Sequence, residues 1–258
     1  MSQRIVFIGA GNLATHLAVE LKKQGCFIVQ VYSRTESSAE ALAEKLHSDY
    51  VTSPQNIMED ADIYFVALKD SVIDEVLSEV RLNNRLVVHC SGSLPLSVLE
   101  KYSSNAGVFY PLQTFSKSRE VDFKTIPVFV EGSSRENENI LLKLAQKISE
   151  KVTILDSEKR IYLHIAAVFA CNFVNHFYSI SSDILNSKDI SFEVLQPLIH
   201  ETALKVMHKT PQDAQTGPAV RFDKNIISAH ENALASFPEY RELYRKISEN
   251  IFNYYNHR

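Results

Sequence analysis

The sequence is poor in the features that mark several classes of protein. Its three cysteines, Cys26, Cys90 and Cys171, are an odd number without CxxC spacing, so we expect reduced thiols rather than disulfides. The net charge of −4 leaves no basic excess to displace counterions, which argues against nucleic acid as a main partner. No HExxH or other metal-ligand spacing joins the histidines, so no metal is expected.

Long apolar runs are also missing. No run reaches the roughly 18 residues of a membrane span, and the first predicted strand begins at Arg4, which leaves no room for a signal peptide. We therefore expect a cytoplasmic protein without a membrane partner. With 258 residues, 45% of them hydrophobic and 22% charged, the chain can form one large domain or two modest ones.

The opening of the chain carries its strongest pattern. Residues 5–8 form a short apolar run that predicts a buried parallel strand, and an amphipathic helix follows the glycines at once. Between them, residues 9–14 match G-x-G-x-x-G/A, which in this context indicates a dinucleotide site rather than a plain glycine turn. Phosphates would meet the free N–H groups of the helix. The expected cofactor contacts here are Gly9, Ala10, Gly11, Asn12 and Leu13.

The end of the second predicted strand, residues 27–32, faces the adenosine ribose in such folds. An acidic residue there would bind the 2′-hydroxyl of NAD, but this sequence has Ser33, Arg34 and Thr35. An arginine can instead grip a 2′-phosphate through charge-assisted hydrogen bonds. NADP is therefore preferred over NAD, although an arginine that only solvates a loop would look the same.

Strand and helix signals alternate up to about residue 156. The further predicted strands are residues 50–51, 62–68, 86–90, 107–110, 126–131 and 152–155. This alternation of strands and helices predicts an α/β domain with a doubly wound, mainly parallel sheet of the Rossmann type. Ligands of such sheets lie at the carboxyl ends of the strands. That rule adds Leu68, Lys69, Ser91 and Gly92 to the cofactor contacts, and Gln113 and Thr114 are a further candidate loop.

After residue 156 no convincing strand remains, so we place a dinucleotide-binding domain at 1–156 and an all-helical domain at 157–258. The helix expected at 159–185 is apolar nearly all round, which means that it is buried on every side. One small domain can hardly surround it. We therefore infer a homodimer, two-fold and formed through the helical domain.

Two groups of residues in the helical half could carry chemistry. His164 and Asn172 interrupt the apolar helix and, eight residues apart, are expected on one face with Val168 between them; His176 is a weaker candidate. A histidine, with its usual pKa of about 6.5, could donate a proton during reduction. In the segment 216–223, Arg221 and Asp223 could orient an anionic or carbonyl substrate. The alternatives are internal hydrogen bonds in the helix and a salt bridge within the loop.

The whole chain resembles a bacterial family of Rossmann-like oxidoreductases with a helical C-terminal domain of unknown function. The resemblance rests on the segments 9–14, 32–35, 111–115 and 164–172 and on Thr216-Gly-Pro218 with Arg221 and Asp223. The first half is similar to pyrroline-5-carboxylate reductase and deazaflavin-dependent NADP oxidoreductases, and more distantly to the 6-phosphogluconate and β-hydroxyacid dehydrogenases. The resemblance implies NADP, a helical dimerisation domain and a substrate pocket between the domains.

The sequence departs from these relatives at one telling position. Hydroxyacid dehydrogenases of that superfamily carry a lysine one helical turn before an asparagine. If Asn172 is that asparagine, the lysine position is Val168, which cannot exchange protons. The substrates of these relatives are therefore not carried over. Taken together, the sequence favours an NADPH-dependent reductase of a small carbonyl or imine, with His164 as proton donor or substrate orienter. The alternative is a non-catalytic NADP-binding sensor or a dimeric scaffold.

Overall fold

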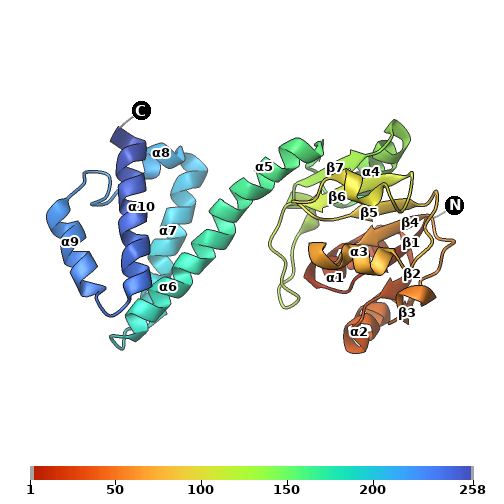
Figure 1. The fold of residues 1–258 in the computed structure, drawn as a ribbon, viewed down its shortest axis with the longest axis horizontal. Coiled ribbons are helices and arrows are strands. Elements are labelled where there is room, and N and C mark those ends of the chain that lie inside the picture. Colours follow the sequence, from red (N-terminus) through yellow and green to blue (C-terminus); the bar gives the residue numbers. More distant parts are fainter. Residues whose placement is uncertain (1–2, 257–258) are drawn as a thin grey trace. The chain divides into compact units, whose positions relative to one another are not determined.

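The computed structural model describes residues 3–256, which form two compact units (Figure 1). One unit ends at Cys171 and the other begins at Asn172. The first contains an eight-stranded sheet with helices on both faces, and the second is all helix. This architecture confirms the predicted α/β fold followed by a helical region. The two units divide inside the long helix, whereas the sequence places the domain boundary at its start.

The sheet follows the order β3-β2-β1-β4-β5-β6-β7-β8. Its strands are β1 (Arg4–Ile8), β2 (Phe27–Tyr32), β3 (Asp49–Val51), β4 (Ile63–Val66), β5 (Leu86–His89), β6 (Ala106–Pro111), β7 (Val128–Gly132) and β8 (Val152–Ile154). All neighbours are parallel except β6 and β7. The strand order therefore reverses at β1, next to β4, which is the position where doubly wound sheets bind their ligands.

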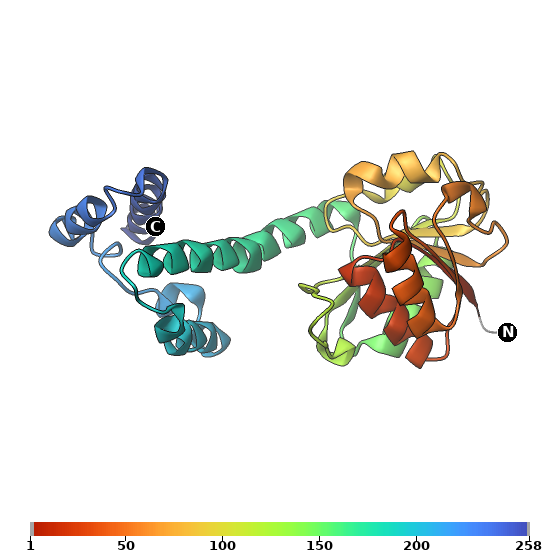
Figure 2. The same ribbon diagram turned by 90° about the horizontal axis from the view of Figure 1, so that it is seen from below.

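Helices cover both faces of the sheet because the central strands are apolar on both sides. One face packs against α1 (Asn12–Lys23), α2 (Glu36–Leu46) and α4 (Arg135–Ile148), through side chains such as Leu17, Leu42 and Leu141. The other face packs against α3 (Ile73–Leu77), through Val76, and takes up Leu163 of the long helix. Figure 2 shows the red α1 and the amber α3 on opposite sides of the sheet. Short 3-10 helices connect other elements: η1 (Pro54–Asn56), η2 (Asp70–Val72), η3 (Leu96–Leu99), η4 (Phe123–Thr125) and η6 (Phe192–Leu195).

The predicted long helix spans Ser157–Asn186 and is not uniform. It consists of α5 (Ser157–Ala167), a π-helical stretch (Val168–Phe173) and α6 (Val174–Asn186). By length and mean hydropathy it could cross a membrane, although the sequence contains no uninterrupted apolar run of that length. Averaging the hydropathy over the helix conceals its polar interruptions. Within this chain only Arg160 of the helix is buried, so the expected burial on every side is not provided by the single chain.

The second unit continues with α7 (Gln196–His208), α8 (Pro211–Ala214), α9 (Lys224–Ala233) and α10 (Pro238–Asn256). Within residues 172–256 only Ala219, Ile227 and Ser248 are buried. Large apolar side chains such as Leu198 and Met207 are 63% and 74% exposed. By itself this unit therefore has almost no closed hydrophobic core, in contrast to the first.

Candidate functional site

The turn between β1 and α1 uses its two glycines in different ways. Gly9 has a φ of +120°, and a Cβ there would lie 2.4 Å from the carbonyl oxygen of Ala67, so no other residue fits without strain. Gly11 has no positive φ, and a Cβ there would meet no atom within 4 Å. Space beside Gly11 is what close approach of a ligand to the backbone requires. Ala10 and Ala14 are buried.

The N-terminus of α1 is suited to an anion. Gly11 is its N-cap, no side chain caps it, and no acidic residue occupies its first turn, which includes Asn12 and Leu13. The amide of Asn12 instead donates a hydrogen bond to the carbonyl of Phe115, 3.0 Å away, and so holds the loop after β6. The backbone N–H groups and the positive end of the helix dipole are thus left for a phosphate group.

The residues after β2 form a small polar corner. The backbone N–H of Ser33 donates to the carbonyl of Val51 at 3.2 Å, and that of Thr35 donates to the Ser33 hydroxyl at 3.4 Å. The Arg34 guanidinium is exposed, and its ion pair with Glu75 of α3 measures 3.8 Å. An exposed pair of this length contributes little stability, so Arg34 can turn to another anion.

The loops after β4 and β5 are joined to each other by Ser91. Its hydroxyl donates to the carboxylate of Asp70 at 3.0 Å and accepts from the backbone N–H groups of Ser93 and Leu94, both at 3.1 Å. Asp70 directly follows Leu68 and Lys69. The predicted contacts Leu68, Lys69, Ser91 and Gly92 therefore lie in two loops that share one hydrogen-bond network at the carboxyl edge of the sheet.

His164 packs directly on this network. A Cβ at Gly92 would lie 2.6 Å from Nδ1 of His164 and 2.8 Å from the Tyr110 ring, so only glycine leaves room for both side chains. The Tyr110 hydroxyl is hydrogen-bonded to Nδ1 of His164, with the oxygen and nitrogen 3.0 Å apart. Sequence reasoning did not select Tyr110. Its place at the end of β6, on the edge that the strand rule nominates, is the signal that could have found it.

A buried ionic network holds the start of α5 behind this pair. Arg160, only 1% exposed, forms a short ion pair with Glu131 of β7 and a hydrogen bond with the carbonyl of Leu94. The Ser157 hydroxyl donates to Glu131 at 2.7 Å and accepts from the N–H of Leu96 at 2.9 Å. Arg160 precedes His164 by one helical turn, so these contacts fix the position of His164. Arg160 is a second residue that sequence reasoning missed.

His89, at the end of β5, has a different character from His164. It is fully buried, and its Nδ1 accepts a hydrogen bond from the N–H of Ser91 at 3.1 Å. Burial, and then the charge of Arg160, lower the pKa of His89 to about 4, although the carbonyl of Pro95 acts in the opposite direction. His89 is therefore neutral at physiological pH and supports the Ser91 loop.

The π-helical stretch changes which side chains of the long helix share a face. Its hydrogen bonds span one residue more than those of an α-helix, so spacings counted on α-helical geometry no longer tell which side chains share a face. The predicted common face of His164 and Asn172 rests on such a count. Asn172 and His176 are exposed. Single π-turns inside helices occur often at functional sites. The stretch Val168–Phe173 therefore stays a candidate part of the site.

The segment 216–223 has a well-defined structural role. Asp223 caps α9, because its carboxylate accepts the N–H of Ile226 at 3.3 Å, and Gly217 adopts a φ of +115°. Arg221 is exposed, and no ion pair joins it to Asp223 within the described part of the chain.

In the other candidate loop, which follows β6, the Gln113 amide oxygen accepts the N–H of Thr114 at 2.8 Å.

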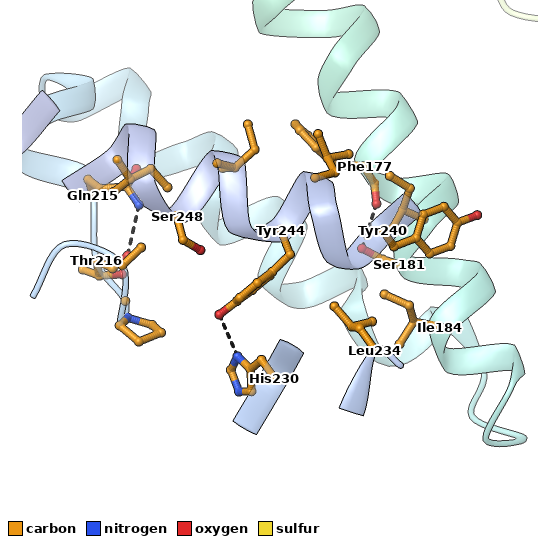
Figure 3. A pocket seen from close by; sticks show the side chains of 17 residues that line it. Phe177, Ser181, Ile184, Gln215, Thr216, His230, Leu234, Tyr240, Tyr244 and Ser248 are labelled. Carbon is orange, nitrogen blue, oxygen red and sulfur yellow. Dashed lines mark hydrogen bonds between the residues drawn. The ribbon is translucent and has the colours of Figure 1, made fainter. Parts of the chain in front are cut away.

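The helical unit has a cavity of about 440 Å³ of its own (Figure 3). Apolar side chains of α6 and α10 line most of it, including Phe177, Ile184 and Ile247. The hydrogen bond between His230 and the Tyr244 hydroxyl, 2.9 Å long, lies on its wall, and residues 216–218 also line it.

The first unit thus contains all predicted cofactor contacts together with His164. Asn172, Arg221 and Asp223 belong to the second unit. Among the residues described, no group of three or more His, Cys, Asp or Glu side chains is arranged to hold a metal ion.

Comparisons with known proteins follow the same division. A family described as NADP oxidoreductase coenzyme F420-dependent matches residues 4–92, and a domain of unknown function, DUF2520, matches residues 126–251. A Bacteroides fragilis protein provisionally named an NADP oxidoreductase is 46% identical, with 98% of each chain covered and a TM-score of 0.91. No curated protein matches the chain.

Two more distant structures are similar over nearly the whole chain. A reductive aminase from Aspergillus terreus, solved with NADPH and ethyl-5-oxohexanoate, is 13% identical, covers 97% of this chain and 93% of its own, and has a TM-score of 0.70. A 1-pyrroline-5-carboxylate reductase from Streptococcus pyogenes is 14% identical, covers 98% and 99%, and has a TM-score of 0.64. At these identities the likeness shows a common fold.

Proposed function

The chain belongs to the family of the Bacteroides fragilis protein provisionally named an NADP oxidoreductase, and from this premise we propose that it is an NADPH-dependent reductase of a small carbonyl or imine compound. One observation carries the proposal. His164 packs on Gly92 at the same edge of the sheet as the dinucleotide turn, so a group able to donate a proton lies beside the loop expected to meet the cofactor.

The residues present fit NADP. The uncapped N-terminus of α1, the space beside Gly11 and the absence of acid in the first turn suit a pyrophosphate, and exposed Arg34 suits a 2′-phosphate. When bound, NADPH supplies the hydride. The protein must then hold an electrophilic C=O or C=N group and provide a proton for its oxygen or nitrogen.

We assign the supply of this proton, or the orientation of the substrate, to His164. Asn172 is proposed to hydrogen-bond the substrate, and Arg221 to bind an anionic group on it. Asp223 was predicted beside Arg221, and its capping of α9 supports a role in shaping the loop that carries Arg221. The substrate is thus a small molecule, and the proposed location is the cytoplasm.

Steady-state oxidation of NADPH tests the proposal. The panel consists of oxo acids, cyclic imines with a carboxylate, ketones with amines, and an oxidised deazaflavin, because the relatives are named for reactions or cofactors of these kinds. We expect turnover of at least one compound. His164→Gln is expected to lower that turnover roughly 10²–10⁴-fold, to a residual rate, while NADPH still binds, and His200→Gln, at an exposed position on α7, serves as the matched control. Equal activity of both variants would remove His164 from the mechanism.

A non-catalytic NADP sensor or dimeric scaffold is the second candidate, and Val168 favours it. The position where hydroxyacid dehydrogenases of the superfamily carry a lysine holds a side chain that cannot exchange protons. If NADPH raises the melting temperature but no compound in the panel is turned over, the sensor replaces the reductase.

We also propose that the protein is a homodimer formed through its helical half. Residues 172–256 bury only three side chains, while Val194, Leu198 and Met207 are at least 60% exposed. Burial of apolar surface must offset roughly 1–2 kcal/mol of backbone entropy per ordered residue, so helices this exposed need a second surface. A two-fold partner supplies the same apolar surface in return.

A further inference from the structure

Tyr110 and His164 form a pair that connects β6 to α5. The two residues are 54 positions apart in the sequence, and their only mutual hydrogen bond joins the Tyr110 oxygen to Nδ1 of His164 at 3.0 Å. Their rings meet edge to face, with centroids 6.0 Å apart. The Tyr110 ring is also 6.5 Å from that of Phe129 on β7, which limits its movement.

The direction of this hydrogen bond follows from the environment of Tyr110. Burial raises the pKa of the Tyr110 phenol, with the charge of Arg160 opposing, so the phenol keeps its proton at neutral pH. A protonated phenol can either donate to Nδ1 or accept from an Nδ1–H group. Within the described residues the hydroxyl has one partner, the imidazole nitrogen, so only donation to Nδ1 gives the phenol proton an acceptor. A hydroxyl that donates to Nδ1 leaves the ring proton of neutral His164 on Nε2.

We propose that Tyr110 is a positioning residue that holds His164 as the Nε2–H tautomer, so that Nε2–H is the group that meets the substrate. The part of this inference that concerns catalysis rests on the proposed reductase function. Nδ1 is already engaged, and Nε2 has no hydrogen-bond partner in the described part of the chain. A donor fixed in this way can stabilise the charge that develops on a carbonyl oxygen or imine nitrogen.

Two features of the surroundings show that the pair is built rather than accidental. Gly92 leaves room for both rings, since a Cβ there would lie within 2.8 Å of each. The buried Arg160–Glu131 ion pair anchors α5 one turn before His164. Separate contacts therefore set the geometry of His164: Arg160 fixes its position on α5, and Tyr110 fixes the orientation of its ring.

The tautomer itself can be measured without any substrate. In 15N-histidine spectra of the full-length protein, with the His164 signals assigned by their loss in His164→Gln, we expect neutral His164 as the Nε2–H tautomer. Tyr110→Phe keeps the ring and removes the hydroxyl, and it is expected to give a mixture of tautomers. The matched control is Tyr64→Phe, because Tyr64 is also buried and its hydroxyl donates to the Met58 carbonyl away from the site. A predominant Nδ1–H form in the wild type, or unchanged His164 shifts in Tyr110→Phe, would overturn the proposal.

Kinetics then test the role in catalysis. Tyr110→Phe is expected to lower kcat roughly five- to tenfold, the effect of one hydrogen bond, with the KM for NADPH unchanged. In a His164→Gln background the same substitution should have no further effect, because Tyr110 acts through His164. An equal loss in both backgrounds would mean a merely structural role and would contradict the inference. If the wild type turns over nothing, the reductase function fails while the tautomer measurement still decides on the pair.

Discussion

Two histidines at the carboxyl edge of the sheet show how environment separates residues of one type. His89 is fully buried, accepts a hydrogen bond from the N–H of Ser91, and has a pKa lowered to about 4. His164 is only partly buried and packs on Gly92 beside Tyr110. The first supports a loop, and the second is the proton donor or substrate orienter that we propose. The sequence alone shows two histidines that each follow apolar residues.

The low pKa of His89 makes stability depend on pH. In the unfolded chain a histidine has a pKa near 6.5, so His89 of the unfolded state binds a proton below that pH. In the folded state His89 binds it only at about pH 4. Stability is therefore fully present above pH 6.5 and is lost as the pH falls. We expect His89 to contribute roughly 2 kcal/mol to the loss between pH 7 and pH 5.

Urea unfolding of the wild type and of His89→Gln at pH 7 and pH 5 measures this contribution. It is the difference between the two proteins in the slope of the free energy of unfolding against pH. His47→Asn, at an exposed residue with positive φ, is the control and should retain the wild-type slope. An identical pH dependence in all three proteins would show that His89 is not the group responsible.

Arg34 determines the cofactor preference in our interpretation. Its ion pair with Glu75 is long and exposed, so Arg34→Ala should leave the melting temperature unchanged. We expect the Kd for NADPH to rise roughly tenfold or more, as for the loss of a charge-assisted hydrogen bond, while the Kd for NADH stays the same. Calorimetric titration with both cofactors gives the two constants, and Arg81→Ala, at another exposed arginine, is the control. A parallel change for NADH would assign Arg34 another role.

At the scale of elements, the two glycines of the β1–α1 turn have different surroundings. Gly9 is needed for the fold, because its φ and its contact with Ala67 exclude a side chain. Gly11 has an ordinary φ and open space around it, so a side chain there would be accepted by the fold. The motif predicts both glycines, but it does not say which one the fold requires and which one leaves space for the proposed cofactor.

Alanine substitutions distinguish these tasks. Gly9→Ala should destabilise the protein by roughly 1–3 kcal/mol, the usual cost of a strained backbone position. Gly11→Ala should melt like the wild type but bind NADPH more weakly, because the methyl group occupies the space beside the helix N-terminus. Thermal melting and calorimetric titration of the pair check this. Wild-type NADPH affinity in Gly11→Ala would speak against a pyrophosphate at this turn.

The long helix shows the limit of periodicity at the same scale. Its extent, Ser157–Asn186, is close to the prediction of 159–185. The π-helical stretch at Val168–Phe173 was not foreseen. Apolar residues occupy nearly every position there, so no alternation of polar and apolar residues marks a change of helical pitch.

At the scale of the whole molecule, the contrast between the two units is the main result. The first unit has two apolar clusters, one on each face of its sheet. The second has helices with well-formed caps, such as Thr210 and Asp223, but almost no buried side chains. Caps define where its helices begin and end, and in the proposed homodimer a second apolar surface would stabilise them.

If the proposed homodimer forms through the helical half, a charge on its apolar side chains should separate the subunits. Phe177, on α6, lines the cavity of the helical unit and is 38% exposed. We expect sedimentation to give twice the mass of one chain for the wild type and a single-chain mass, or a loss of helical structure, for Phe177→Glu, because an unpaired charge is costly in an apolar interface. Lys188→Glu, just beyond the same helix, is the control. A wild type that sediments as a single chain would refute the dimer.

The sequence by itself determined the order of the elements, the dinucleotide turn and the loops at the carboxyl ends of the strands. These follow from local patterns and from one rule about parallel sheets, so no knowledge of distant contacts is needed. Only the tertiary structure decided that His164 meets Gly92 and Tyr110, that Arg160 is buried against Glu131, and that His89 is neutral. Each of these depends on packing between residues far apart in the chain, and burial, which sets their chemistry, exists only once the chain has folded.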